Sequence, residues 1–443
     1  MKLKYTAQTI TTWTAVAVTV AVLAKTFIPF YWIGSTAIFM GTSALGALLV
    51  LINWRSLGED ASRIIEVLFL LGALYGLVIA NFFVLSRPAV PLTYLLGILI
   101  FHGLFLTFGF AAARALEAVL QVLLSAAAIY SIILIEYAVR FGDVMRGLGI
   151  DDVFRIGNWS VYITLHQNIG LVIGLGAVAA LGLAASRIKL ILALVAIPII
   201  MLLFFHIAAR TALIALVCGV IFWALAELWV RSKKATIFGA VAILITAIVS
   251  SLVFFQLALQ DHNVSSAELD AMSRTIRELQ DPNPQFRLPI WTNTLHEIAN
   301  EPGRLLFGRG IGMYPVNKGF GAPDWLLHLT EGSKHYIHNV HLEMLYETGS
   351  AGLLLFSILT AFPLVAALWR WQFFSSAQKS AVSIYVFILV SADISGNFAL
   401  SYMDQFFFAL TIGIIALERA GDAVIPGLCR PIGVCVEDMP RRL

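Results

Sequence analysis

The chain alternates between long apolar segments and short polar breaks. About twelve of these segments are long enough to cross a bilayer as helices, since about 20 apolar residues span the hydrocarbon core. They lie at residues 10–30, 33–53, 63–85, 90–110, 115–138, 165–184, 188–207, 210–230, 235–258, 340–367, 380–399 and 403–419. The pattern predicts an all-α polytopic membrane protein, with the first segment as an uncleaved helix.

One polar stretch, residues 259–339, is far longer than the other breaks. It holds six of the fourteen prolines and two tryptophans, which favour an ordered cap over a floppy linker. Ser265 with Glu268 predicts a helix that ends near Gln280. Pro289 followed by apolar residues at helical spacing, Trp291, Leu295 and Ile298, predicts an amphipathic helix that ends before Pro302. We therefore expect three units: membrane helices in 1–258, a loop domain in 259–339, and membrane helices with a cytoplasmic tail in 340–443.

The distribution of cations orients the chain. With a cytoplasmic N-terminus, the inside loops hold many cations, as the positive-inside rule requires: Lys2, Lys4, Arg55, Arg63, Arg114, Arg187, Lys189, Arg231, Lys233, Lys234, Arg370 and Lys379. The short outside loops hold only Arg87, Arg140, Arg146, Arg155 and Arg210. The long loop then faces outward, where its charges count little for orientation.

Composition agrees with a membrane protein. Hydrophobic residues make up 60% of the chain and charged residues 12%, against about 25% charged in soluble domains. The net charge of +3 comes without a basic cluster, so no nucleic-acid partner is expected. Three scattered cysteines and the irregularly spaced His328, His335, His338 and His341 give no metal-ligand set. We expect neither a metal nor a cofactor.

The first candidate for chemistry is His338, in the run HNVHLEMLYETGSAG. It stands where the long loop ends and an apolar helix begins. Free N–H groups and the helix dipole at such an N-terminus attract anions and favour a neutral imidazole. A neutral imidazole beside an anion suits a general base for a hydroxyl, with Asn339, His341 and Glu343 as orienting residues. The alternative is an interfacial histidine that turns its polar edge toward water.

Two arginines on the same predicted membrane face are the next candidates. Arg210 opens an apolar segment in HIAARTALIAL, where a charge is costly unless it is paired or used. Arg287 precedes the amphipathic helix, and a guanidinium can grip a phosphate with two hydrogen bonds. The alternatives are contact with lipid phosphate for Arg210 and a solvated loop charge for Arg287.

Weaker candidates lie nearby. Arg309 and Lys318 are further cations of the loop, and the glycine-rich turn FGRGIG is either a phosphate nest or a plain tight turn. Asp393 and Asp404 are expected to be helix caps or partners of an arginine. One histidine and several arginines, with no metal set and no nucleotide loop, suit transfer from a lipid-linked pyrophosphate. The arginines hold the pyrophosphate as it leaves, and the histidine deprotonates the acceptor hydroxyl.

These residues also resemble a known family, the bacterial O-antigen ligases within the wider ligase and polymerase group. The family pattern is a histidine, then Asn, Ser or Gln, nine residues, Gly, two residues, and Gly, Thr or Tyr. This chain has His338, Asn339, Gly349 and Gly352 at those positions. Arg210 matches the family's arginine before a small-residue helix, although a serine more often precedes it. Arg287 before Trp291 matches the arginine of the large periplasmic loop.

The resemblance implies a membrane glycosyltransferase fold of the GT-C type in the bacterial inner membrane, with its active site facing the periplasm. It also implies transfer of O-antigen polysaccharide from undecaprenyl pyrophosphate to lipid A–core, without a metal and with inversion. By the same resemblance His338 is the base, and Arg210 and Arg287 are catalytic pyrophosphate binders. Asn339, Arg309 and Lys318 complete the expected substrate-binding set.

Three other functions stay open at this point. An O-antigen polymerase uses the same donor but another lipid-linked glycan as acceptor. A protein O-oligosaccharyltransferase uses a protein hydroxyl. A transporter of lipid-linked glycans would place charges at mid-membrane, where only Lys25 and Glu136 stand out from nearly uncharged spans.

Overall fold

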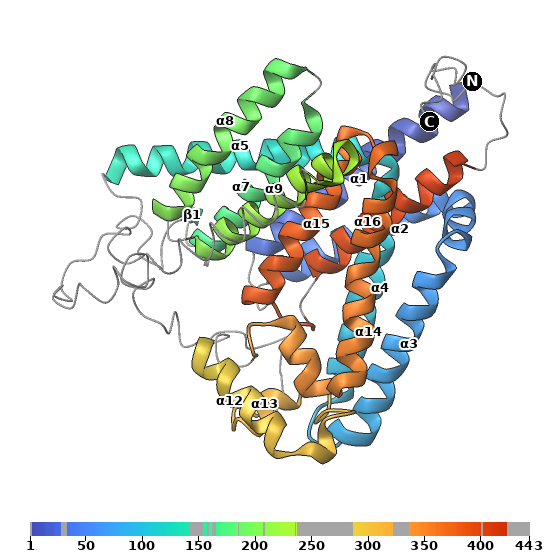
Figure 1. Ribbon diagram of the computed structural model, residues 1–443, viewed down its shortest axis with the longest axis vertical. Coiled ribbons are helices and arrows are strands. Elements are labelled where there is room, and N and C mark those ends of the chain that lie inside the picture. The colour runs from blue at the N-terminus through green and yellow to red at the C-terminus, as the bar shows by residue number, and fades with distance from the viewer. Residues whose placement is uncertain are drawn as a thin grey trace.

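The computed structural model describes residues 2–27, 33–141, 154–156, 159–161, 165–184, 186–206, 209–234, 236, 287–321, 336–399 and 402–422. Over these residues the chain is mostly helical (Figure 1). The long helices are α1 (Lys2–Phe27), α2 (Ile33–Ser62), α3 (Ile65–Asn81), α4 (Leu92–Ala112), α5 (Leu116–Phe141), α7 (Leu165–Leu183), α8 (Arg187–His206), α9 (Arg210–Arg231), α12 (Arg287–Asn300), α14 (Val340–Arg370), α15 (Ser376–Ser395) and α16 (Tyr402–Asp422). Short helical turns are η1 (Phe82–Ser86), η2 (Ala113–Ala115), η4 (Pro302–Arg304), α13 (Met313–Asn317) and η6 (Trp371–Phe373).

Eleven of the twelve predicted membrane segments coincide with helices. Apart from residue 236, the segment 235–258 lies outside the described residues, as does the helix predicted from Ser265 to Gln280. Six stretches of the described chain are both long and apolar enough to cross a membrane. The helical membrane architecture is therefore confirmed, whereas twelve crossings and the GT-C type stay predictions.

One element departs from the all-α prediction. Strands β1 (Phe154–Ile156) and β2 (Trp159–Val161) pair antiparallel, with Arg155 opposite Ser160. The hairpin follows α5 where the sequence predicted only a loop. Its three residues per strand are too few for hydrophobic alternation to reveal it.

The outward faces of several helices are apolar. On α8, the side chains of Ile191, Leu192 and Leu202 are exposed. A water-soluble monomer rarely exposes such a contiguous apolar surface, whereas lipid solvates it without cost. Together with the apolar lengths of the helices, this makes the chain a multi-pass membrane protein.

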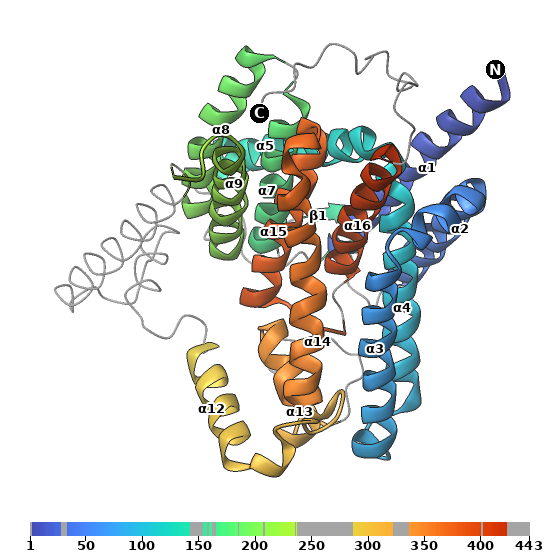
Figure 2. The same cartoon turned by 45° about the vertical axis from the view of Figure 1, so that its right-hand side comes forward.

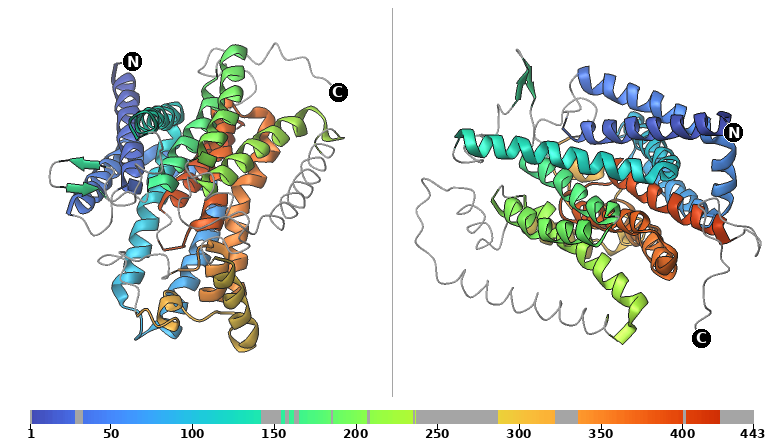
Figure 3. Two further views of the ribbon diagram at one scale, coloured as in Figure 1. Left: turned by 90° about the vertical axis from the view of Figure 1, so that its left-hand side faces the viewer. Right: turned by 90° about the horizontal axis from the view of Figure 1, so that it is seen from above.

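Helix α15 runs antiparallel to its neighbours in the bundle. Helix α15 packs on α9, α7 and α16, while α16 packs on α4 and α14 packs on α3. Seen from above, α1 runs alongside α2 and α5 (Figure 3). Lys379 of α15 pairs with Glu227 of α9 at 2.6 Å, and a Cβ at Gly219 would stand 3.1 Å from the Ser383 carbonyl oxygen. Helix α9 therefore starts where α15 ends.

These directions define two ends of the bundle. At the loop end, α3 and α15 terminate and α9, α14 and α16 begin, and α12 and α13 lie there as well (Figure 2). At the opposite end, Arg114 after α4 and Arg419 of α16 reach the α2–α3 junction. All three leading candidates lie at the loop end: Arg210, Arg287 and His338. This agrees with the prediction that they share one face of the membrane.

The loop domain has a small core of its own. Ile298, Tyr314, Ile337 and Tyr346 are buried together. The amphipathic helix predicted from Pro289 is confirmed as α12, and Trp291 packs against this core. Leu295 was expected on the same face but is half exposed, because the adjacent Thr294 faces inward instead. The core joins α12 and α13 to the first turns of α14.

Candidate functional site

Helix α14 begins with a capped and strained segment. The Asn339 side chain caps the helix by accepting a hydrogen bond from the Leu342 N–H at 2.7 Å. His338, one residue earlier, has φ 61°, a left-handed conformation that is uncommon outside glycine. Its side chain is buried, and its ring centroid lies 4.1 Å from that of Tyr336. Such strain persists only where the surroundings enforce it and is frequent at functional sites.

Arg287 anchors α12 to the end of α15. Its guanidinium donates to the Ile394 carbonyl oxygen at 2.9 Å and to the Ser395 hydroxyl at 3.3 Å. Burial lowers the pKa of Arg287, an effect that the nearby Tyr336 opposes. Burial raises the pKa of Tyr336 to about 12, against the opposing charge of Arg287. At neutral pH the Tyr336 phenol is therefore protonated.

The last turn of α15 also holds the start of α14. The Asp393 carbonyl oxygen accepts a hydrogen bond from the Asn339 amide at 2.8 Å. The Asp393 carboxylate lies 2.5 Å from Nδ1 of His341. The sequence had suggested an arginine as the partner of Asp393, but its partner is this histidine. One helix end thus contacts Arg287, Asn339 and His341, and Trp291 reinforces the arrangement by donating to the Ile337 carbonyl oxygen at 2.9 Å.

Arg210 stands level with this helix end. It is the first residue of α9 and is partly buried. From Gly219 back to Arg210 the helix rises about 14 Å, and the same rise along antiparallel α15 leads from Ser383 to the turn that holds Asp393. The N-terminal N–H groups of α9 lie at this level too, and they add positive potential.

The glycine-rich turn is not a phosphate nest. The N–H groups of Arg309 and Gly310 donate to the carbonyls of Tyr346 and Glu347 at 3.0 and 2.9 Å. The Ile311 N–H donates to the Asn81 side chain at 3.0 Å. These amides dock the turn on the bundle, so they are unavailable to a ligand. The alternative of a structural turn is correct.

The docking depends on a break in α14. Gly349 has φ 70° and ψ −170°, which interrupts the helix. Beyond the break, the Ser350 and Ala351 N–H groups donate to the carbonyls of Leu305 and Leu306 at 2.8 and 3.1 Å. A Cβ on Gly349 would stand 2.4 Å from the Leu306 carbonyl. The glycine of the family pattern therefore allows two backbones to touch.

Two of the predicted substrate-binding cations are engaged within the loop. The Arg309 guanidinium donates to the Glu297 carbonyl oxygen at 2.7 Å and stacks over the Tyr346 ring, 4.6 Å from its centroid. The Lys318 ammonium pairs with the Glu297 carboxylate. Both cations hold α12 against the turn that follows it. Their roles as substrate ligands stay predictions that these contacts do not support.

Sequence reasoning missed two residues that fix the loop. Asn81, at the end of α3, donates to the Phe307 carbonyl oxygen at 2.5 Å in addition to accepting from Ile311. Glu347, buried in α14, accepts from the N–H groups of Gly312 and Tyr314. A polar residue in an apolar segment is costly unless it has a partner. The presence of Asn81 and Glu347 in apolar segments therefore indicated that each has a polar partner, but the sequence did not show which residues those partners are.

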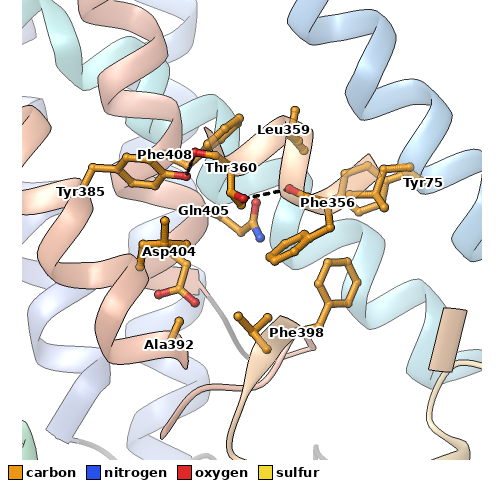
Figure 4. Close-up of a pocket in the computed structure, with 13 residues that line it drawn as sticks. Tyr75, Phe356, Leu359, Thr360, Tyr385, Ala392, Phe398, Asp404, Gln405 and Phe408 are labelled. Atoms are coloured by element: carbon orange, nitrogen blue, oxygen red, sulfur yellow. Dashed lines mark hydrogen bonds between the residues drawn. The ribbon is translucent and has the colours of Figure 1, made fainter. Parts of the chain in front are cut away.

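A small cavity lies directly beneath the site (Figure 4). Its wall includes Phe356, which contacts the His341 ring, and Phe398, whose N–H donates to the buried Glu343. Its volume of about 30 Å³ accommodates one or two water molecules. A sugar or a pyrophosphate does not fit there. Among the described residues no cluster of histidine, cysteine and carboxylate could hold a metal ion.

Comparison with known proteins gives a family match for the middle of the chain. A search of curated proteins finds no match. Residues 169–357 match a family model described as O-Antigen ligase. The matched region runs from α7 into α14 and includes Arg210, Arg287 and His338. Over residues 169–357 the chain is similar to the O-antigen ligase family, which confirms the resemblance drawn from the sequence.

Proposed function

We propose that this protein is an O-antigen ligase that transfers O-antigen polysaccharide from undecaprenyl pyrophosphate to lipid A–core. The observation that carries the proposal is the meeting of Arg287, Asn339 and His341 on the last turn of α15, beside His338. The family match supports a ligase or polymerase type of enzyme. The pattern from His338 to Gly352 favours the ligase.

In the proposed reaction the acceptor hydroxyl attacks the anomeric carbon of the lipid-linked sugar. A new carbon–oxygen bond forms as the bond from that carbon to the pyrophosphate oxygen breaks, and attack from the opposite side inverts the configuration. The hydroxyl proton passes to the neutral imidazole of His338. The electron pair of the broken bond leaves with the pyrophosphate, so the activated donor supplies the energy and no nucleotide is required.

Positive charge at the loop end favours the leaving group. Arg287 is fixed by its contacts with α15, which orients its guanidinium before the substrate binds. Arg210 and the N-terminal amides of α9 lie level with the same turn. A preorganised cationic site of this kind stabilises the charge that develops on pyrophosphate without reorganisation during the reaction. Neither step requires a metal ion.

The proposed location is the bacterial inner membrane, with the loop end facing the periplasm. The distribution of cations supports this orientation, because the predicted cytoplasmic loops hold most of them. The paired Arg63, Arg114 and Arg419 all lie at the opposite end. The lipid-linked donor would then approach His338 from the outer leaflet.

The test is a reconstituted assay with purified protein, undecaprenyl-pyrophosphate-linked O-antigen and lipid A–core, in EDTA and without ATP. Wild type is expected to produce laddered lipopolysaccharide. His338→Ala should lower the rate by about 100-fold or more, the usual range for loss of a general base. The control is His296→Ala, because His296 is exposed on α12 and bonds only Asn300 in the described structure.

The same assay separates the competing functions. Lengthening of the lipid-linked glycan with unmodified lipid A–core would identify a polymerase. Glycosylation of an added hydroxyl-bearing protein would identify a protein O-oligosaccharyltransferase. Full activity of His338→Ala would refute the role of His338 as general base, but it would not refute the proposed glycan transfer. The side chains of Lys25 and Glu136, on which a transporter reading relied, lie outside the described residues.

A further inference from the structure

A second cavity lies at the opposite end of the bundle. It has a volume of about 470 Å³, within the range of about 300–1,000 Å³ usual for small-molecule sites. Helices α2, α3, α4 and α16 form its wall. The lining includes Gly58 and Leu57 of α2, Leu68 of α3, Phe110 of α4 and Ile412 of α16.

This cavity is separate from the candidate active site. Along α3, Leu68 lines the cavity and Asn81 contacts the loop domain, so about 20 Å of helix lies between them. Figure 2 shows the α2–α3 junction at the far end of α3 from α13. A ligand in this cavity therefore cannot touch His338 or Arg287.

The walls favour a hydrocarbon chain over a glycan. Apart from Trp54 and Arg55 at the rim, Thr107 is the one polar side chain among the lining residues. Its hydroxyl donates to the Gly103 carbonyl of its own helix at 2.6 Å, so it offers no donor to a ligand. A sugar buried here would lose its hydrogen bonds to water without replacement, whereas an acyl chain would gain apolar burial.

The charge at the rim selects the headgroup. At this end Arg63 and Arg114 pair with Asp60, and Arg419 pairs with Glu66. Arg55 is exposed at the cavity mouth and forms no ion pair with any residue that the structure describes, although Glu59 lies one helical turn away. A guanidinium binds a phosphate with two charge-assisted hydrogen bonds. Trp54 beside it is also exposed, as is typical of tryptophans at the headgroup level.

We propose that this cavity binds one acyl chain of an anionic glycerophospholipid, with the lipid phosphate on Arg55. The site is independent of the transferase reaction proposed above. The apolar volume, the rim arginine and the membrane setting together specify this occupant. The lipid would pack between α2, α3 and α16 and fill space that no side chain of the described chain occupies.

The test measures retained lipid by native mass spectrometry. Purified protein is incorporated into nanodiscs of phosphatidylglycerol or phosphatidylcholine with identical acyl chains, then released and weighed. Wild type should retain one phosphatidylglycerol and little phosphatidylcholine. Arg55→Gln should reduce phosphatidylglycerol retention by about tenfold, the scale of one lost charge-assisted contact. Arg231→Gln is the control, because Arg231 is an exposed arginine at the same end that lines neither cavity.

A second variant tests the cavity itself. A Cβ at Gly58 meets no atom within 4 Å, so Gly58→Leu should fill the space without a clash and abolish retention of the lipid. Gly72→Leu is matched, since Gly72 is an exposed helical glycine with equally open surroundings outside the lining. Equal retention of both lipids by wild type would overturn the role of Arg55. Wild-type retention by Gly58→Leu would overturn the site.

Discussion

Gly349 is the residue on which the loop domain depends most directly. Its φ of 70° with ψ of −170° is a conformation almost restricted to glycine. In Gly349→Ala the new Cβ would also lie 2.4 Å from the Leu306 carbonyl and 2.5 Å from the Gly308 nitrogen. Both contacts are backbone atoms that cannot rotate away. The substitution must therefore either strain α14 or push the turn off the helix.

The size of the effect follows from two contributions. The unfavourable backbone conformation costs about 1–3 kcal/mol, and the steric overlap adds about 1–3 kcal/mol. Four backbone hydrogen bonds cross this contact, and each contributes about 0.5–1.5 kcal/mol. The strain thus cancels much or all of what holds the turn in place. We expect the free energy of local opening to fall by about 2 kcal/mol or more relative to wild type, which raises the opening equilibrium constant roughly thirtyfold.

Hydrogen exchange measures this opening. The Arg309, Gly310, Ser350 and Ala351 amides should exchange at least about thirtyfold faster in Gly349→Ala, whereas amides within α15 should not change. Gly303→Ala serves as the control, because a Cβ at Gly303 meets no atom within 4 Å although it lies in the same loop. Unchanged exchange at those four amides in Gly349→Ala would refute the proposed docking.

Two further predictions test the anchors around the site. Asn81→Ala removes both hydrogen bonds between α3 and the turn and should destabilise the loop domain by about 1–3 kcal/mol. Hydrogen exchange at the Ile311 amide measures this loss. Exchange no faster than in Gly303→Ala would contradict the prediction. Asn339→Ala removes the cap of α14, at a cost of about 0.5–2 kcal/mol, together with the contact to Asp393. Asn339→Ser keeps a capping hydroxyl but is too short to reach Asp393, so glycan transfer by Asn339→Ser should fall between Asn339→Ala and wild type. Equal loss in both would show that the Asp393 contact, and not the cap, decides activity.

The helices were predictable because their signal is local. An apolar run of about 20 residues determines a membrane helix without knowledge of its neighbours. The segment predicted at 340–367 is accordingly observed as Val340–Arg370. Its interruption at Gly349 was not predicted, since the sequence shows only two glycines, Gly349 and Gly352, in a helix that could have tolerated them. The reason for the break is the loop backbone that lies against it.

The residues of the site were predictable by type but not by contact. His338, Arg287 and Arg210 stood out because charges are rare in this chain. The carbonyl of Ile394 that orients Arg287 is 107 residues away in sequence and belongs to an apolar helix. No pattern of residue types reports which backbone carbonyl will lie beside a guanidinium.

Arg309 has contacts within the loop that the sequence did not predict. It was predicted as a substrate ligand from its position in a loop rich in glycine and cations. Its buried guanidinium lies on Tyr346 and near Glu301, at 3.4 Å. These partners come from α14 and from the end of α12, so only tertiary packing brings them to Arg309. A loop arginine surrounded by aromatic and acidic partners stabilises the loop first.

The spacing in the family pattern has a structural meaning in this chain. The pattern fixes the number of residues between His338, at the start of α14, and Gly349, where the turn docks. From Val340, where the helix begins, to Gly349 the helix rises about 14 Å at 1.5 Å per residue. Inserting one residue would rotate the helix start by about 100° relative to the docked turn. Asn339 and His341 would then turn away from Asp393, which both of them contact. The pattern therefore specifies a helical length and phase between the docked turn at Gly349 and the residues that begin α14, which accounts for its fixed spacing over nine residues.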